Sequence, residues 1–142
     1  MPDGRRTRAA LARLRSHEEG KQLLAELGRD LVVCYGDVHE GVLQSDGALI
    51  LQRDRSVPAN AARLGHLVHH LVRGLPFDER AVRTSTLACS ELAKNAEEAE
   101  RSAHQLESRL RGAFGLGPLP FEDLVDDYAK RCQTLRQKAP SP

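Results

Sequence analysis

The sequence is poor in aromatic side chains: it has no tryptophan, and aromatic residues make up only 4% of its 142 residues. Hydrophobic residues nevertheless account for 40% of the chain. The core must therefore be built from leucine, valine and alanine, a composition that suits packed helices. Charged residues make up 29%, which is normal for a folded protein and excludes wholesale disorder. A chain of this length can bury a core without help from metals or disulfides.

The chain also lacks an excess of charge of either sign. Its 21 basic and 20 acidic residues leave a formal net charge of +1. The protein as a whole therefore has little electrostatic attraction for the phosphate backbone of a nucleic acid. Arginines gathered in residues 5–15 could contact phosphates, but the composition as a whole disfavours nucleic acid as a partner. No stretch approaches the roughly 20 apolar residues of a membrane-spanning helix. The sequence therefore predicts a cytoplasmic protein with no membrane partner.

Cysteine is scarce as well. The chain has three, Cys34, Cys89 and Cys132. They are odd in number and widely spaced, so they form neither a CxxC metal motif nor a disulfide framework. We expect three reduced, partly buried thiols.

The first half of the chain predicts helix followed by two strands. Leucines recur at helical intervals over residues 7–27, but Gly20 interrupts the run and Ser16 could cap a second segment. Either one kinked helix or two short helices would satisfy this pattern, and Gly28 is a natural end for it. Residues 30–35 and 48–52 are short and apolar, and they predict an antiparallel strand pair that helices must cover.

Three further helices are predicted at about residues 56–73, 84–113 and 120–137. This order predicts an α+β fold in which helix dominates, as one domain over residues 7–137 with disordered ends at 1–6 and 138–142. The helix over 84–113 would span about 45 Å, which is more than a core of this size needs. Part of it therefore packs against another protein or a second copy of the chain, or else the first and last helices cover it.

One cluster could carry chemistry. Half of the six histidines, His66, His69 and His70, fall within five positions. On a helix, His66 and His70 lie one turn apart on the same face, the spacing at which zinc metalloproteases present two imidazoles to one metal. His69 lies about 100° further round the helix and faces elsewhere. The alternatives are an ordinary structural role for these histidines or a pH-sensing one.

The surrounding parts add a resemblance. A helix reading LARLRSHEEGKQLLAEL, a strand pair, the helix AARLGHLVHHLV and the glutamate-rich helix EEAERSAHQLESRLR follow one another in the chain. In this order, residues 8–115 resemble the compact zincin-like metallopeptidases of the ImmA/IrrE-type group. The resemblance implies a third, carboxylate ligand from the glutamate-rich helix, best matched by Glu100, with Glu97 and Glu91 as neighbours. It thus predicts His66, His70 and Glu100 as metal ligands, with zinc as the metal.

The sequence departs from the zincin pattern at one decisive position. Where HExxH has the glutamate that acts as general base, this chain has Leu67, and leucine can neither accept nor donate a proton. The resemblance then implies a pseudo-enzyme with no catalytic residue, and we expect no cofactor, with a zinc ion as the alternative. We expect a regulatory or adaptor protein that binds another protein. The alternatives are a zinc-binding protein with residual metallohydrolase activity and an unrelated helical interaction module.

Overall fold

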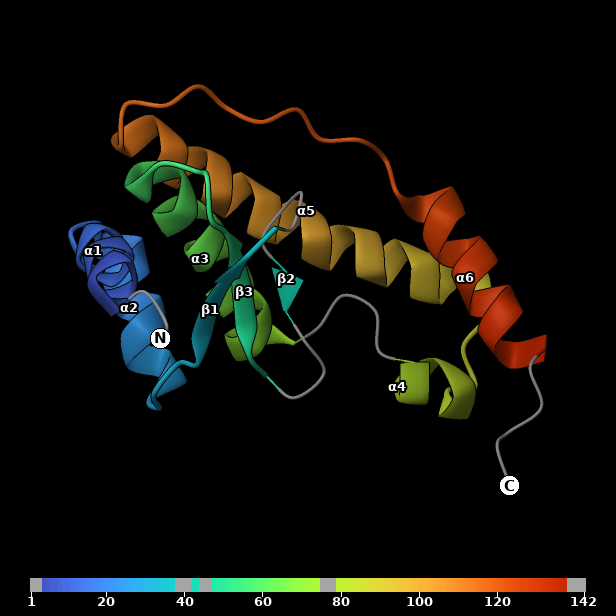
Figure 1. Ribbon diagram of the computed structural model, residues 1–142. Helices are drawn as coiled ribbons and strands as arrows, with labels where there is room; N and C mark the ends of the chain where they lie inside the picture. Colours follow the sequence, from blue (N-terminus) through green and yellow to red (C-terminus); the bar gives the residue numbers. More distant parts are fainter. Residues whose placement is uncertain (1–3, 38–41, 44–46, 75–78, 138–142) are drawn as a thin grey trace. The chain divides into compact units, whose positions relative to one another are not determined.

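The computed structural model describes residues 4–37, 42–43, 47–74 and 79–137. Helix dominates and is joined by a small sheet (Figure 1), so the predicted α+β class is confirmed. The predicted tail 138–142 and residues 1–3 lie outside the described residues, and residues 4–6 are helical. In chain order the elements are α1 (Gly4–Arg15), α2 (Glu18–Leu27), β1 (Val33–Gly36), β2 (Val42–Leu43), β3 (Leu49–Gln52), α3 (Val57–Arg73), α4 (Glu79–Thr84), α5 (Cys89–Ala113) and α6 (Val125–Gln137).

The described residues group into two compact units. The first contains those of residues 1–73 and 103–119, and the second those of residues 74–102 and 120–142. Helix α5 is continuous across this division. Because such a grouping does not decide whether each unit folds by itself, the single domain over residues 7–137 stays a prediction.

The first segment forms two short helices, which is one of the two alternatives that its pattern allowed. Helix α2 begins after His17, whose Nδ1 accepts a hydrogen bond from the Glu19 N–H at 3.3 Å; His17 is therefore the capping residue in place of Ser16. A Cβ at Gly20 would lie 2.2 Å from a backbone oxygen of α1, so the close approach of the two helices requires glycine. Gly28 ends α2 in the left-handed conformation, with φ 63°, as predicted.

The sheet has three strands in the order β1-β3-β2. Strand β1 pairs with β3 in parallel, with Val33 opposite Leu49, so the predicted antiparallel pairing of these two segments is wrong. The antiparallel neighbour of β3 is β2, with Val42 opposite Ile50. The chain leaves β1, turns back as β2, and turns again as β3, which lies between the other two strands. This double reversal gives β3 the direction of β1.

Helix α3 is the central helix of the first unit, and its limits confirm the predicted helix over 56–73. The Ser56 Oγ accepts a hydrogen bond from the Ala59 N–H at 3.3 Å, which caps the helix, and Gly74 follows its end with φ 110°. Helices α1 and α2, the sheet and the last turns of α5 share one core with it. The buried members of this core are Ala10, Leu14, Leu23, Val33, Leu49, Leu51, Ala61, Ala62, Leu64, Leu67, Val68, Leu106 and Leu110.

The second unit contains α4, the first part of α5, and α6. Helix α4 was not predicted, and because residues 79–84 form this separate helix, α5 begins at Cys89 and not at Thr84. Arg136 of α6 donates hydrogen bonds to the carbonyls of Val82, Ser85 and Leu87. These bonds hold the connection between α4 and α5 against α6. Helix α6 begins at Val125, five residues after the predicted start.

Cys89 and Cys132 form a disulfide with their Cα atoms 5.6 Å apart. The prediction of three reduced thiols is therefore wrong for this pair, and Cys34 is the free, exposed cysteine. The two positions are 43 residues apart in sequence, but α5 and α6 both pack around Val82 and Leu135. Tertiary packing thus brings the thiols within bonding range, which an odd count and wide spacing could not reveal.

The apolar side of α5 is buried by its own chain. In the second unit, Ala93 and Ala96 pack against Tyr128 of α6; in the first, Leu106 and Leu110 join the main core. The length of this helix therefore needs no partner to explain it, and binding of another protein or a second copy stays a prediction. None of the helices in the described ranges is long and apolar enough to cross a bilayer.

Candidate metal centre

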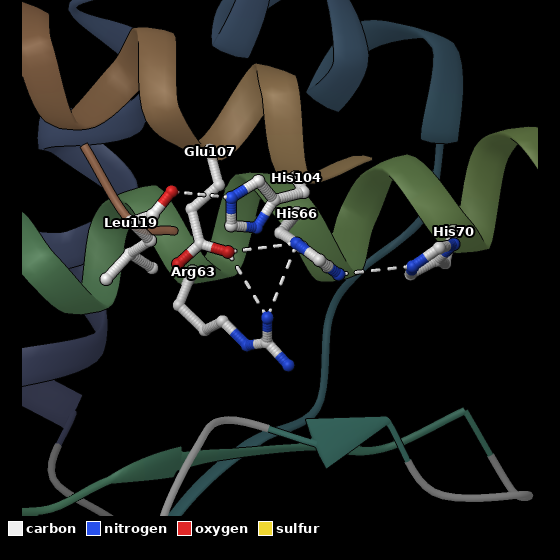
Figure 2. Close-up of polar contacts among 6 residues, drawn as sticks. All are labelled: Arg63, His66, His70, His104, Glu107 and Leu119. Atoms are coloured by element: carbon white, nitrogen blue, oxygen red, sulfur yellow. Dashed lines mark hydrogen bonds and ion pairs between the residues drawn. The ribbon is translucent and has the colours of Figure 1, made fainter. Parts of the chain in front are cut away.

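Helix α3 presents two buried imidazoles to each other. His66 and His70 are 1% and 4% exposed, and their Nε2 atoms lie 3.2 Å apart (Figure 2). The convergence expected from the one-turn spacing is therefore observed. His69 lies outside the pair, with its ring edge-on to that of His70 at 6.1 Å between centroids. Burial, and then the neighbouring His70, lower the pKa of His69, so its imidazole is neutral at neutral pH.

His66 also contacts a buried carboxylate, that of Glu107, which its sequence pattern had not indicated. Glu107 of α5 is fully buried, and its Oε1 lies 2.9 Å from Nδ1 of His66 and 3.2 Å from Nη1 of Arg63 (Figure 2). Burial by itself raises the pKa of Glu107. The hydrogen bond with His66 and the charge of Arg63 together outweigh burial, and they hold this pKa below its usual value. Glu107 is therefore an ionised carboxylate at neutral pH.

This carboxylate determines which nitrogen of His66 carries a proton. An ionised carboxylate can only accept hydrogen bonds, so the proton of the 2.9 Å contact lies on Nδ1 of His66. The neutral ring then has its lone pair on Nε2, the atom that faces His70. Metal-binding histidines are commonly oriented by a carboxylate in this way. Arg63, 3.3 Å from the same Nδ1, compensates the buried negative charge of Glu107.

The distance between the two Nε2 atoms fits a shared metal. Zinc in tetrahedral coordination, at its usual distance to imidazole nitrogen, separates two such nitrogens by about 3.3 Å; the observed separation is 3.2 Å. A hydrogen bond between the rings fits the same distance if His70 carries its proton on Nε2. A proton and a metal ion cannot both occupy the space between the two nitrogens. Measuring the bound metal therefore distinguishes the zinc-bound pair from the hydrogen-bonded pair.

The third predicted ligand, Glu100, lies on α5, in the part of this helix that belongs to the second unit. His66, His70 and Glu100 each offer one ligand atom, and these atoms all lie within 4.8 Å of one another. Two imidazole nitrogens and one carboxylate oxygen are donors that zinc accepts. The group could therefore hold a metal ion.

The other predicted neighbours have different surroundings. Glu97 is buried and ion-paired with Arg101 of the same helix, and Glu91 is exposed. Leu67, at the position of the zincin base, is 3% exposed and belongs to the hydrophobic core. The side chain at this position therefore packs among apolar residues.

One signal in the sequence could have pointed to Glu107. It lies four positions after Ala103 and three before Leu110, so it shares the apolar side of α5 with them. A glutamate on that side must be paired with a cation or a hydrogen-bond donor if it is buried. The partner itself, His66, lies 41 positions earlier and is brought close only by tertiary packing.

Comparison of the sequence with protein-family models and with curated proteins, and of the structure with solved structures, finds no match. The zincin-like resemblance of residues 8–115 therefore stays a prediction that rests on the order of elements and on the histidine spacing. What the site can bind follows from its donor atoms and their burial.

Proposed function

We propose that this protein is a zincin-like metal-binding domain without peptidase activity, in which His66, His70 and Glu100 hold a zinc ion. The observation that supports the proposal is the 3.2 Å separation of two buried Nε2 atoms. Glu107 adds to it, because its bond to Nδ1 of His66 directs the lone pair of that ring toward the shared point.

Each residue of the site has a separate task in this proposal. Bound zinc supplies a concentrated positive charge and Lewis acidity at this point. Glu107 holds the tautomer of His66, and Arg63 keeps that buried carboxylate ionised. Leu67 offers no group that can take a proton and lies in the core. The set that binds the metal therefore lacks the base that zincin hydrolysis uses.

A site that holds a metal but lacks a base favours a regulatory role over a catalytic one. We propose that the domain acts in the cytoplasm as an adaptor that binds another protein, with zinc stabilising its folded state. Zinc bound only by the folded state raises stability by mass action. The adaptor role then depends on a domain whose folded population follows zinc supply.

Metal content tests this proposal most directly. Untagged wild-type protein is loaded with zinc, dialysed and analysed for metal beside the double variant His66→Ala/His70→Ala. The matched control is His69→Ala, which removes an imidazole from the same helix but outside the pair. We expect near-stoichiometric zinc in the wild type and the control, and none in the double variant. A wild type that retains no zinc, or a double variant that retains all of it, contradicts the proposal.

Peptidase activity tests the non-catalytic part separately. The zinc-loaded protein is incubated with unfolded casein and with a mixture of short peptides. We expect no cleavage above that of the double variant. Cleavage that requires zinc and disappears in the double variant would show that the protein is an enzyme despite Leu67.

A further inference from the structure

The disulfide of the second unit joins two cysteines that differ in their access to solvent. Cys132 of α6 is 0% exposed, whereas Cys89 at the start of α5 is only partly buried. A small thiol exchanges with a disulfide by attacking a sulfur that it can reach. Exchange at this bridge in the folded protein therefore takes place at Cys89.

The position of Cys89 also favours a reactive sulfur once the bridge is open. Cys89 is the first residue of the 25-residue helix α5, and the unpaired N–H groups at a helix start stabilise the negative charge of a thiolate. The opposing charge in the first turn is that of Glu91, an exposed side chain that solvent screens. Cys89 is thus the more reactive thiol of the pair as well as the more accessible one.

Arg136 keeps the two cysteines close to each other without help from the bridge. It lies one turn after Cys132 on α6. Its Nη2 donates to the carbonyls of Ser85 and Leu87 at 3.1 and 2.7 Å, in the connection that leads to Cys89. These bonds involve neither sulfur, so reduction does not remove them. The two thiols therefore stay at a high effective concentration, from which the bridge re-forms readily.

The bridge is nevertheless a large part of the packing around it. The core at this point has three buried members, Val82, Cys132 and Leu135, and Cys89 and Leu92 pack against them. Opening the bridge removes the covalent link between α5 and α6 from this small cluster. Helix α6 should therefore be more mobile in the reduced protein.

We infer that Cys89 and Cys132 form a reversible redox switch that exchanges with a small thiol such as glutathione. On closing, the Cys89 thiolate attacks one sulfur of oxidised glutathione, and one glutathione thiolate leaves. The Cys132 thiolate then attacks Cys89 Sγ, and the second glutathione leaves. Two electrons pass from the protein to oxidised glutathione, and the released thiolates take up the two protons that the cysteines lose. Reduction reverses both steps.

Trapping of the mixed disulfide tests which sulfur exchanges, and it needs no metal because neither cysteine is a proposed zinc ligand. Cys34→Ser removes the exposed free thiol and is the parent of both test proteins. Adding Cys132→Ser leaves Cys89 alone, and adding Cys89→Ser leaves Cys132 alone. With oxidised glutathione, we expect the folded Cys89 protein to react at least about tenfold faster than the folded Cys132 protein, and both to react alike in denaturant. Equal rates in the folded proteins overturn the inference.

The parent gives a second reading that does not depend on how those variants fold. Acid quenching during bridge formation, followed by peptide mapping, should find the transient glutathione on Cys89; glutathione on Cys132 overturns the inference. At several ratios of reduced to oxidised glutathione, the bridged fraction should be the same from either direction. Amides of α6 should exchange with solvent at least about tenfold faster in the reduced parent. A bridge that does not open in native buffer, or unchanged exchange, also overturns it.

Arg136→Gln tests the hold on the reduced pair. In the parent, this change should lengthen the lifetime of the mixed disulfide at least about threefold, because the two sulfurs then meet less often. Arg83→Gln removes the same charge from an exposed position of α4 and is the control. Equal lifetimes in the two variants would contradict the role of Arg136.

Discussion

The Nδ1 atom of His66 and the Oε1 atom of Glu107 lie 2.9 Å apart, and both side chains are shielded from solvent. One residue comes from the middle of α3 and the other from the last turns of α5. Their contact orients the imidazole that faces His70. A substitution that weakens this contact should therefore lower the metal affinity even where the fold is retained.

Glu107→Gln should lower the zinc affinity about 10- to 100-fold, the usual effect of losing a carboxylate that orients a ligand histidine. The amide keeps the shape of the side chain but loses its charge, so Arg63 also loses its ionic partner and stability falls by about 1–3 kcal/mol. Competition with a chromophoric chelator measures the affinity. Glu98→Gln, at an exposed position of the same helix, is the control. Unchanged zinc affinity in Glu107→Gln would show that the contact does not tune the site.

Leu67→Glu should destabilise the protein and should not create a peptidase. Leu67 packs in the hydrophobic core, so a carboxylate there is buried without a partner and costs upwards of about 3 kcal/mol. Leu67→Met, which conserves volume, should cost less than about 1.5 kcal/mol. Chemical denaturation gives both values. A Leu67→Glu protein as stable as the wild type, with zinc-dependent peptide cleavage, would mean that position 67 has access to the metal.

Gly65→Ala should weaken both the packing and the metal site. A Cβ at this position would lie 2.4 Å from Leu110 Cδ1 and 3.1 Å from Leu14 Cδ1. These core side chains must shift, at a cost of about 1–3 kcal/mol, and Glu107 lies one turn from Leu110. Gly112→Ala is the control, because a Cβ there meets nothing within 4 Å. Urea denaturation and zinc titration should show losses only in the first variant; equal behaviour of the two would refute the close approach at Gly65.

Reduction of the disulfide should lower the stability of the second unit by about 2–4 kcal/mol, the usual contribution of a bridge that closes a loop of this size. Thiol titration of the native, air-oxidised protein should find the single exposed Cys34, and all three cysteines after reduction and unfolding. The double variant Cys89→Ser/Cys132→Ser should melt like the reduced protein. Three reactive thiols before reduction would contradict the bridge. If the chain works in the cytoplasm, glutathione keeps the pair reduced, and the lower stability applies there.

The ion pair of Glu19 and Arg109 should contribute to stability only above acidic pH. Two bonds of 2.9 and 2.7 Å join the side chains, and the hydrogen bond from Arg109 holds the pKa of Glu19 below its usual value of 4.5. A lowered folded-state pKa gives stability that is fully present above the ordinary pKa and is lost as the pH falls through the lowered one. Both side chains are about half exposed, so the effect is below about 1 kcal/mol.

Denaturation of the wild type and of Glu19→Gln at neutral pH and at about pH 2 measures this contribution. The difference between the two proteins should be present at neutral pH and should shrink toward zero in acid. A difference that persists unchanged in acid would assign it to packing of the Glu19 side chain and not to its charge.

The parts that the sequence predicted well depend on local geometry. The helix over 56–73 follows from the periodicity of its leucines and valines, and the pairing of His66 with His70 follows from that helix alone, because residues four apart share a face. The capping role of Gly28 is equally local, since it depends on one backbone conformation.

The parts that the sequence did not predict depend on segments that are far apart in the chain. The parallel direction of β1 and β3 is fixed by β2, whose two residues lie between them in sequence but at the far edge of the sheet. The disulfide of Cys89 and Cys132 and the contact of His66 with Glu107 require helices to meet. No periodicity within one segment carries that information.

Helix α3 carries the proposed zinc ligands His66 and His70 in its C-terminal half, and most of its residues from 60 to 70 are buried. Its amide hydrogens should therefore exchange with solvent only when the whole first unit opens. Zinc bound at one end of the helix would then slow the exchange of amides at its other end as well, even without moving an atom there, because all of them depend on a single opening equilibrium.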